Sequence, residues 1–182
     1  GGGADDVTSG AGADTIILSG TNNDTVSAGA GADTITGALG NDSIDAGADA
    51  DQINLTLDGL TSDDTVDGGT GTDILHLSAI GTSADADFTN VTNIETLNTA
   101  DVTTGVTALV LSTEAAEAGI TTINNQSDGT ADTITIQAGF ATNDLTINLD
   151  QTDAAAADGV SVTATAFTKN LTLNAGILTF AN

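Results

Sequence analysis

The chain has 182 residues but no cysteine, proline, methionine, tryptophan or tyrosine, and only one histidine and four phenylalanines. Without cysteine, and with His76 as the single imidazole, it cannot form disulfides, thiolate zinc sites or multi-histidine metal centres. So few aromatic side chains cannot fill a wide globular core, and we expect a thin one. No apolar run reaches the ~18 residues that a membrane span requires.

Positive charge is almost absent as well. Lys169 is the single basic residue against 26 acids, which gives a formal charge of −25. Such a chain cannot neutralise a phosphate backbone or an anionic lipid surface, so we expect no nucleic-acid or membrane partner and favour cations instead. Apolar residues make up 39% of the chain and are mostly β-branched and regularly spaced, which favours an ordered all-β fold over disorder.

A short repeat organises the first part of the chain. The triplet of Asp, any residue and then Ile, Val or Leu recurs at intervals of 9, 10, 9, 9, 9, 13 and 9 residues. Its aspartates are Asp5, Asp14, Asp24, Asp33, Asp42, Asp51, Asp64 and Asp73. Small residues precede the aspartate in the best-preserved units, residues 10–14, 29–33 and 69–73. The pattern predicts glycine-rich turns that alternate with short strands.

The same alternation assigns an inward and an outward face. The apolar residue two positions after each aspartate is expected to point inward, whereas threonines such as Thr15, Thr25 and Thr34 face water. The inward residues are Val7, Ile16, Val26, Ile35, Ile44, Ile53, Val66 and Leu75. If two units make one coil, the aspartates fall into two rows, one of Asp5, Asp24, Asp42 and Asp64 and one of Asp14, Asp33, Asp51 and Asp73.

The turns and their aspartates together offer an all-oxygen ligand set. Glycines such as Gly29 and Gly31 let the chain turn sharply and aim carbonyl oxygens at one point, and the aspartate adds a carboxylate. Such hard ligands select Ca²⁺ over softer metals and suit its flexible geometry better than that of Mg²⁺. Coils stacked ~4.8 Å apart would also bring the carboxylates of a row into repulsion, which a cation between turns relieves.

These units resemble the RTX (repeats-in-toxin) calcium-binding β-roll family, whose nonapeptide is G-G-x-G-x-D-x-(apolar)-x. The resemblance covers roughly residues 1–78 and implies that calcium is held between successive turns of one side by aspartates and turn carbonyls. The metal residues that it implies are Asp5, Asp14, Asp24, Asp33, Asp42, Asp51, Asp64, Asp73, Gly10, Gly12, Gly29, Gly31, Gly69 and Gly71.

Several turns depart from this nonapeptide. Asn22 and Asn23 stand where glycine is expected, and we expect them to adopt left-handed dihedrals. Asp49 replaces another turn glycine, and the turn at residues 38–40 is irregular. The turn at 59–63 follows an insertion, so sites that use Asp64 fit the family pattern least well.

Beyond the repeat, the pattern predicts two more segments. Residues 1–79 form the predicted calcium-binding β-roll, residues 80–120 a short irregular connector with strands, and residues 121–182 a calcium-poor β-solenoid. The connector contains one predicted helix, capped by Ser112 and ended by Gly119. Strands are expected at 106–111, 120–125, 132–138, 145–149, 160–165 and 170–175, with Phe140, Phe167 and Phe180 packing in the last segment. The expected class is an all-β parallel β-roll or β-solenoid.

The sequence N-I-E-T-L-N at residues 93–98 resembles, more loosely, modules of bacterial surface-layer proteins and large secreted adhesins. We therefore predict a calcium-stabilised, extracellular structural protein of the bacterial cell surface. It would leave the cell by type I secretion, fold on binding calcium and assemble as a homo-oligomeric lattice or filament. The alternative is an accessory calcium-binding and secretion module of a type I-secreted toxin or hydrolase.

No enzyme activity is expected. The chain contains no H-E-x-x-H, G-x-S-x-G or phosphate-loop motif. Glu114 and Glu117 could form a catalytic pair, but acidic residues are ordinary in the first turn of a helix. His76 is expected on the surface without a second metal ligand. The outward threonines could suggest an ice-binding array, but they form no uninterrupted T-x-T ladder.

Overall fold

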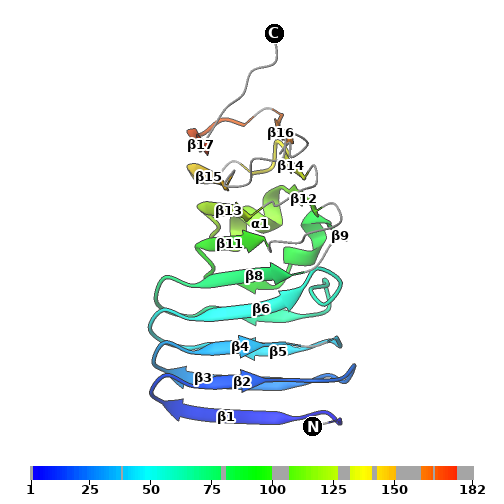
Figure 1. Ribbon diagram of the computed structural model, residues 1–182, viewed down its shortest axis with the longest axis vertical. Helices are drawn as coiled ribbons and strands as arrows, with labels where there is room; N and C mark the ends of the chain where they lie inside the picture. Colours follow the sequence, from blue (N-terminus) through cyan, green and yellow to red (C-terminus); the bar gives the residue numbers. More distant parts are fainter. Residues whose placement is uncertain are drawn as a thin grey trace.

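The structure, a computed structural model, describes residues 2–37, 39–78, 81–99, 107–126, 132–140, 143–150, 161–165 and 167–175. Within these ranges the chain winds into a β-solenoid whose coils stack from the N-terminal end at the bottom of Figure 1 to the C-terminal strands at the top. Every pair of neighbouring strands in the described ranges is parallel. The predicted all-β solenoid class is confirmed.

Three parallel sheets form the walls. Sheet A consists of β1 (Asp6–Ala11), β3 (Thr25–Ala30), β5 (Ser43–Asp45), β7 (Thr65–Asp67) and β10 (Val91–Thr92). Sheet B consists of β2 (Thr15–Ile17), β4 (Thr34–Thr36), β6 (Gln52–Thr56), β8 (Ile74–Ser78), β11 (Thr96–Thr99), β13 (Thr122–Gln126), β15 (Leu145–Asp150) and β17 (Leu171–Ala175). Sheet C consists of β9 (Gly81–Ser83), β12 (Thr107–Leu111), β14 (Thr133–Ile136) and β16 (Ser161–Ala164).

The register of these sheets stacks like residues on like residues. Val7, Val26, Ile44, Val66 and Val91 are successive partners in sheet A. Ile16, Ile35, Ile53, Leu75 and Leu97 are successive partners in sheet B. These two columns meet in the thin core, and all their members are buried except Val7, which is half-buried on the first coil. Each fully buried Ile contributes roughly 1.5–3 kcal/mol, so the repeated apolar position fixes the register coil by coil.

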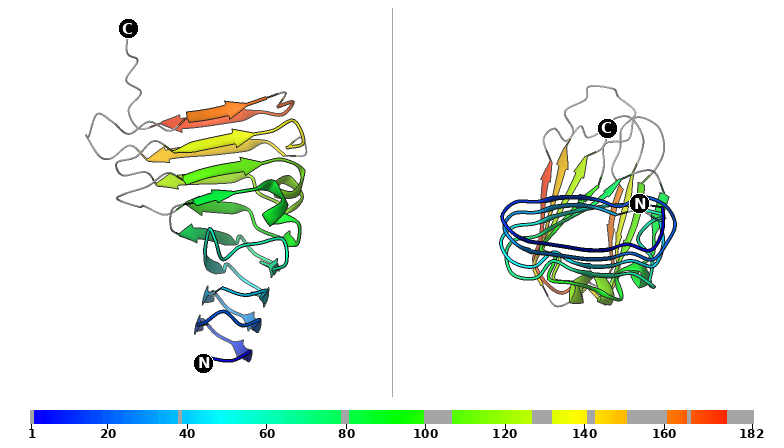
Figure 2. Two further views of the ribbon diagram at one scale, coloured as in Figure 1. Left: turned by 90° about the vertical axis from the view of Figure 1, so that its right-hand side faces the viewer. Right: turned by 90° about the horizontal axis from the view of Figure 1, so that it is seen from below.

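Sheet B continues from β8 to β11 and β13, so a single sheet joins the three predicted segments. The strand direction rotates about the solenoid axis along the stack. In the left view of Figure 2, the strands of the first coils are seen end-on, whereas the later strands run across the view. Sheet A ends at β10, and sheet C replaces it as the second wall from β9 onward. The predicted strands of the C-terminal segment are confirmed as β13, β14, β15, β16 and β17.

Two short helices lie where the walls change, η1 (Asp85–Phe88) and α1 (Thr113–Glu117). Ser112 is the N-cap residue of α1 as predicted, but its side chain makes no capping hydrogen bond. Instead the carboxylate of Asp85 accepts the main-chain N–H groups of Ser112 at 2.6 Å, Ala115 at 3.2 Å and Glu114 at 3.3 Å. A charged acceptor from the neighbouring helix therefore outcompetes the weaker local hydroxyl. Gly119, with φ 102°, ends the helix as predicted.

Phenylalanines fill the wider C-terminal core. Phe88 and Phe140 are fully buried, and the ring of Phe140 lies 6.2 Å from that of Phe167. Phe180 lies outside the described residues. In the described part of the chain, neither helix is long or apolar enough to cross a membrane.

Candidate metal centre

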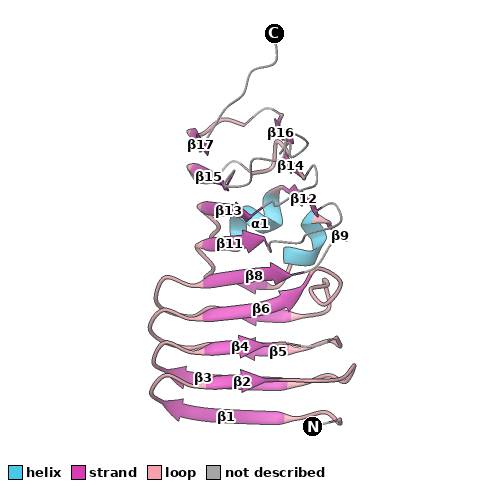
Figure 3. Cartoon of the chain, viewed as in Figure 1, coloured by secondary structure: helices cyan, strands magenta, loops and turns pink. Residues whose placement is uncertain are grey.

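Two stacks of turns flank the N-terminal coils, and Figure 3 shows these loops one above another at the edges of the solenoid. The first turn stack comprises residues 10–14, 29–33, 47–51 and 69–73, each of which leads into a strand of sheet B. The second turn stack comprises residues 2–5, 19–24, 39–42 and 59–64, each of which leads into a strand of sheet A. The turns therefore place one motif aspartate at the start of each strand from β1 to β8.

Glycine is required in the first turn stack by close approach as well as by dihedral angle. Gly29, Gly47 and Gly69 have φ of 106°, 107° and 86°. A Cβ on any of the three would overlap the carbonyl oxygen of the glycine one coil before it. Carbonyl oxygens thus point along the axis from turn to turn, which no side chain at these positions would permit.

The eight aspartates occupy the two predicted rows. In the first turn stack, Oδ1 of Asp33, Asp51 and Asp73 accepts the main-chain N–H of the preceding aspartate of the row at 2.7, 2.7 and 2.8 Å. In the second, Oδ1 of Asp24, Asp42 and Asp64 does the same at 2.8, 2.8 and 2.7 Å. Each carboxylate is therefore fixed against the turn before it, with one oxygen engaged.

The other carboxylate oxygens reveal a missing partner. Asp24, Asp33, Asp51 and Asp73 are at most 2% exposed, and their Oδ2 atoms are buried without a hydrogen-bond donor among the described residues. A buried ionised oxygen without a donor or cation is strongly unfavourable. Three such atoms follow one another in the first row, at Asp33, Asp51 and Asp73, and the fourth lies in the second row at Asp24. Buried carboxylate oxygens beside turn carbonyls fit a hard cation.

The electrostatics of the first row agree with this reading. Burial raises the pKa of Asp51 and of Asp73 above their ordinary value of 3.8, although the main-chain N–H that each accepts acts in the opposite direction. Neighbouring carboxylates raise the pKa further, chiefly Asp73 and Asp33 for Asp51, and Glu95 for Asp73. At Asp51 and Asp73 the ionised form is therefore poorly stabilised by the surrounding protein groups.

The donor set also limits how an ion could be held. Among the described residues, no three His, Cys, Asp or Glu side chains converge on one point. The rows bring carboxylates together as consecutive pairs, so main-chain carbonyl oxygens must supply most of the other ligands. A mixed set of carboxylate and carbonyl oxygens is the kind that calcium takes in proteins.

The second turn stack is less regular, and one sequence expectation fails there. Neither Asn22 nor Asn23 has a positive φ. Their amides bridge turns instead: Nδ2 of Asn22 donates to the Gly2 carbonyl at 3.1 Å, and Oδ1 of Asn23 accepts the Asn41 N–H at 3.0 Å. Side-chain hydrogen bonds thus replace the left-handed backbone that glycine would have provided.

Asp64 closes the second row differently from the other aspartates. Its Oδ2 accepts the main-chain N–H of Thr61 at 2.7 Å and the Thr61 hydroxyl at 2.9 Å. Its own turn therefore satisfies the oxygen that is left without a donor in Asp24, Asp33, Asp51 and Asp73. Asp64 therefore needs a cation less than those four aspartates, in line with its poor fit to the nonapeptide.

Asp49 keeps the glycine conformation despite its side chain. It has φ 80°, one of two positive values among the described non-glycine residues. A Cβ on Gly71 would overlap its carbonyl oxygen, so Asp49 stacks on the next turn as a glycine would. The stacking of its carbonyl on Gly71 accounts for a left-handed conformation that a side chain ordinarily disfavours.

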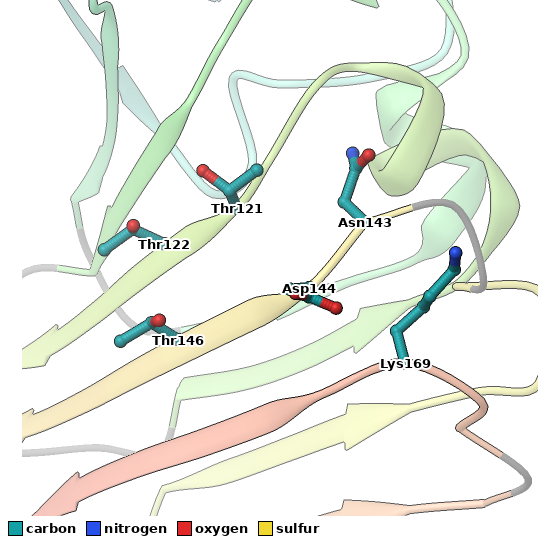
Figure 4. A pocket seen from close by; sticks show the side chains of 6 residues that line it. All are labelled: Thr121, Thr122, Asn143, Asp144, Thr146 and Lys169. Carbon is teal, nitrogen blue, oxygen red and sulfur yellow. The ribbon is translucent and has the colours of Figure 1, made fainter.

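The other candidates from the sequence do not join the turn stacks. Glu114 and Glu117 lie on α1, and His76 is half-buried on β8, between Asn54 and Asn98 in register, with its pKa lowered by burial. Figure 4 shows a shallow groove lined by Thr121, Thr122, Asn143, Asp144, Thr146 and Lys169. Its Asp144 is bound by the main-chain N–H and the amide of Asn170, both at 3.1 Å, which lower its pKa.

Sequence reasoning missed one acid that belongs to the first row. Oε2 of Glu95 accepts the main-chain N–H of Asp73 at 2.9 Å, as each aspartate does for the one before it. The signal was present: Glu95 follows Asp73 by 22 residues, the interval from Asp51 to Asp73, and Leu97 stands at the inward position. A triplet search restricted to aspartate could not find it.

Comparison with known proteins locates the repeat. A family model described as RTX calcium-binding nonapeptide repeat (4 copies) matches residues 1–17, 18–53 and 56–79. No curated protein and no solved structure matches the chain. The matched residues contain both turn stacks and all eight motif aspartates, whereas Glu95 and the later coils lie beyond them.

Proposed function

The N-terminal part of this chain is an RTX calcium-binding β-roll, and from this premise we propose a calcium-stabilised, extracellular structural protein that assembles on the bacterial cell surface. The observation that carries the proposal is the row of buried carboxylates whose Oδ2 atoms have no donor among the described residues. A structural role suits this arrangement because the ligands lie in turns stacked one on another, where an ion would hold one coil on the next.

We assign the ions to the gaps between consecutive turns of each stack. The ligands are the carboxylates of Asp5, Asp14, Asp24, Asp33, Asp42, Asp51, Asp64 and Asp73 and the carbonyl oxygens around Gly10, Gly12, Gly29, Gly31, Gly69 and Gly71. Asp33 lies between two gaps and serves both. The gap between Asp42 and Asp64 is the least well supported calcium site, because Thr61 already binds the second oxygen of Asp64.

Bound calcium supplies the positive charge that the chain itself lacks. Extracellular calcium modules bind at ~10⁻⁴–10⁻³ M, so the ligands would be largely unoccupied in a low-calcium cytoplasm and filled outside the cell. Before export the carboxylates of each row repel one another. After export, bound calcium joins the carboxylates of adjacent coils. This difference suits secretion by the type I route as an unfolded chain.

Assembly on the surface is supported by the charge. The chain has a formal charge of −25 and a single basic residue, so copies repel one another unless cations lie between them. Calcium bridges between copies are therefore favoured over direct contact, and a homo-oligomeric lattice or filament would use the same ion as the rows.

The test is a calcium titration followed by circular dichroism and by electron microscopy. We expect β-structure to form with calcium and to be lost with a chelator, and ordered sheets or filaments to form at millimolar calcium. A β signal that is unchanged in chelator would contradict the calcium role. Calcium-dependent folding into particles that stay monomeric would favour the alternative, an accessory module of a secreted toxin or hydrolase.

A further inference from the structure

The first row of acids does not end with the nonapeptide repeat. Glu95 accepts the main-chain N–H of Asp73 at 2.9 Å, close to the 2.7–2.8 Å by which Asp33, Asp51 and Asp73 bind their predecessors. The extra methylene of Glu95 therefore does not prevent its carboxylate from taking the position of an aspartate. The carboxylates of the row run through four gaps rather than three.

The turn that carries Glu95 is stacked like a repeat turn although its sequence is different. Asn93 has φ 54°, and its carbonyl oxygen lies so close to Gly68 that a Cβ there would overlap it. The Asn93 amide donates to Oδ1 of Asp67 at 2.7 Å, and the Gly68 N–H donates to the Thr92 carbonyl at 3.0 Å. Main-chain oxygens are thus brought against the turn of Asp73, although here the approaching carbonyl belongs to the later coil, whereas in the repeat it belongs to the earlier one.

Asp73 itself supplies the independent sign of a missing partner. It is 0% exposed, its Oδ1 is engaged by the Asp51 N–H, and its Oδ2 is buried without a donor among the described residues. Asp64, the last aspartate of the second row, has its Oδ2 bound by Thr61. The two rows therefore end differently: one is closed by its own turn, and the other leaves a buried carboxylate next to a further acid.

We propose that Asp73 and Glu95, with carbonyl oxygens of the turns at 69–72 and 92–94, form a divalent-cation site of calcium type beyond the repeat. This inference rests on the proposed calcium function, because it extends the same ligand chemistry by one gap. The site lies where the β-roll meets the following coils: the Glu95 carbonyl accepts the N–H of Thr121 and of Thr122 at 3.0 and 3.1 Å. An ion here orders the first coil outside the repeat.

The test compares bound calcium in the full chain and two matched variants by isothermal titration calorimetry. Glu95→Gln keeps an oxygen that can accept the Asp73 N–H but removes the charge, and it should bind one ion fewer than the wild type. Glu117→Gln removes an exposed acid on α1 and should bind the wild-type number. An unchanged count for Glu95→Gln would overturn the proposal.

A second pair of variants tests for the site between Asp73 and Glu95 without changing Glu95. If the row has a fourth gap, Asp73→Asn removes a ligand from two sites and should lose two ions, whereas Asp14→Asn should lose one. Loss of a single ion by Asp73→Asn would mean that the row ends at Asp73. These results are separable from failure of the proposed function, in which the wild-type chain itself would bind no calcium.

Discussion

Two kinds of polar stack run along the solenoid, and their chemistry differs. We call residues 2–78 the aspartate coils, and residues 96–99, 122–126, 145–150 and 171–175 the asparagine strands. In the asparagine strands, Asn98, Asn124, Asn148 and Asn174 are successive partners. Each amide donates from Nδ2 to Oδ1 of the asparagine before it, at 2.8, 2.7 and 2.8 Å.

An amide both donates and accepts, so one asparagine satisfies the next and the ladder carries no charge. A carboxylate only accepts. In the aspartate coils six of the eight carboxylates accept the main-chain N–H of the aspartate before them in the row. Asp24, Asp33, Asp51 and Asp73 leave a second buried oxygen without a donor among the described residues. Every aspartate coil therefore adds negative charge that its own hydrogen bonds cannot balance, which places the calcium dependence in one region of a continuous sheet.

The two systems meet at one strand. Glu95, which extends the acidic row, directly precedes β11, and Asn98 on β11 begins the asparagine ladder. Before that strand, the same column holds Asn54 and His76. The change from charged to neutral stacking thus takes place within four residues.

The largest effect is expected for Asp33→Asn, which keeps the shape and the Oδ1 acceptor but removes a ligand of two ions. At a calcium concentration 100-fold above Kd, each lost ion lowers the free energy of unfolding by about 2.7 kcal/mol, so the loss is about 5 kcal/mol. In chelator the sign reverses, with a gain of about 1 kcal/mol from relieved repulsion. Urea unfolding under both conditions measures this.

Asp58→Asn, at an exposed carboxylate outside the rows, is the matched control and should change stability little under either condition. If Asp33→Asn has the same sign of effect in calcium and in chelator, the carboxylate row is not the calcium-dependent element.

Acid should partly replace calcium. The pKa values of Asp51 and Asp73 are raised in the fold, above all by burial. Between 3.8 and the raised pKa the native state binds more protons than the unfolded chain, so stability in chelator rises as the pH falls from 7 through that window. Thermal unfolding in chelator at pH 7 and at about pH 4 checks the sign. A melting temperature that decreases on acidification would contradict it.

A charge placed in the neutral ladder should destabilise it without involving calcium. In Asn124→Asp the carboxylate can still accept the Asn148 amide but cannot donate to Asn98. We expect a loss of about 1–2 kcal/mol that is equal in calcium and in chelator. Asn124→Ala separates the lost hydrogen bonds from the added charge. Rescue of Asn124→Asp by calcium would show that the asparagine strands also bind the ion.

The smallest change is expected at Asp49, whose φ of 80° favours glycine. Asp49→Gly should stabilise the calcium-bound fold by about 1 kcal/mol, because the left-handed conformation no longer strains a side chain. Asp49→Ala removes the same charge but keeps the Cβ. If both variants raise the melting temperature equally, charge rather than backbone strain is the cause.

The aspartate coils could be predicted from the sequence because each coil repeats the same short residue pattern. A glycine turn, an aspartate and an inward Ile or Val recur together, and the register follows from the apolar position alone. The two rows emerge from the intervals of 19, 18 and 22 residues, and the hydrogen bonds of the structure join the same pairs.

Two of the features that the sequence did not reveal depend on contacts between distant residues, and a third depends on an irregular turn. Asp85 caps α1 from 27 to 30 residues away, so no local cap pattern could identify it. Asn22 and Asn23 bridge to other turns rather than bending their own. Thr61 satisfies Asp64 within an irregular insertion, where the nonapeptide gives no guide. In the first two cases the partner lies in another coil, and in the third it lies in the same turn.

Hydrogen exchange of the full chain, followed by mass spectrometry in calcium and in chelator, measures whether the aspartate coils depend on calcium and the asparagine strands do not. We expect peptides covering β3 to β8 to be strongly protected in calcium and to exchange rapidly in chelator, while those covering β13 and β15 change far less. Equal protection of β3 to β8 in calcium and in chelator would contradict it, because the carboxylate rows would then be stable without a cation.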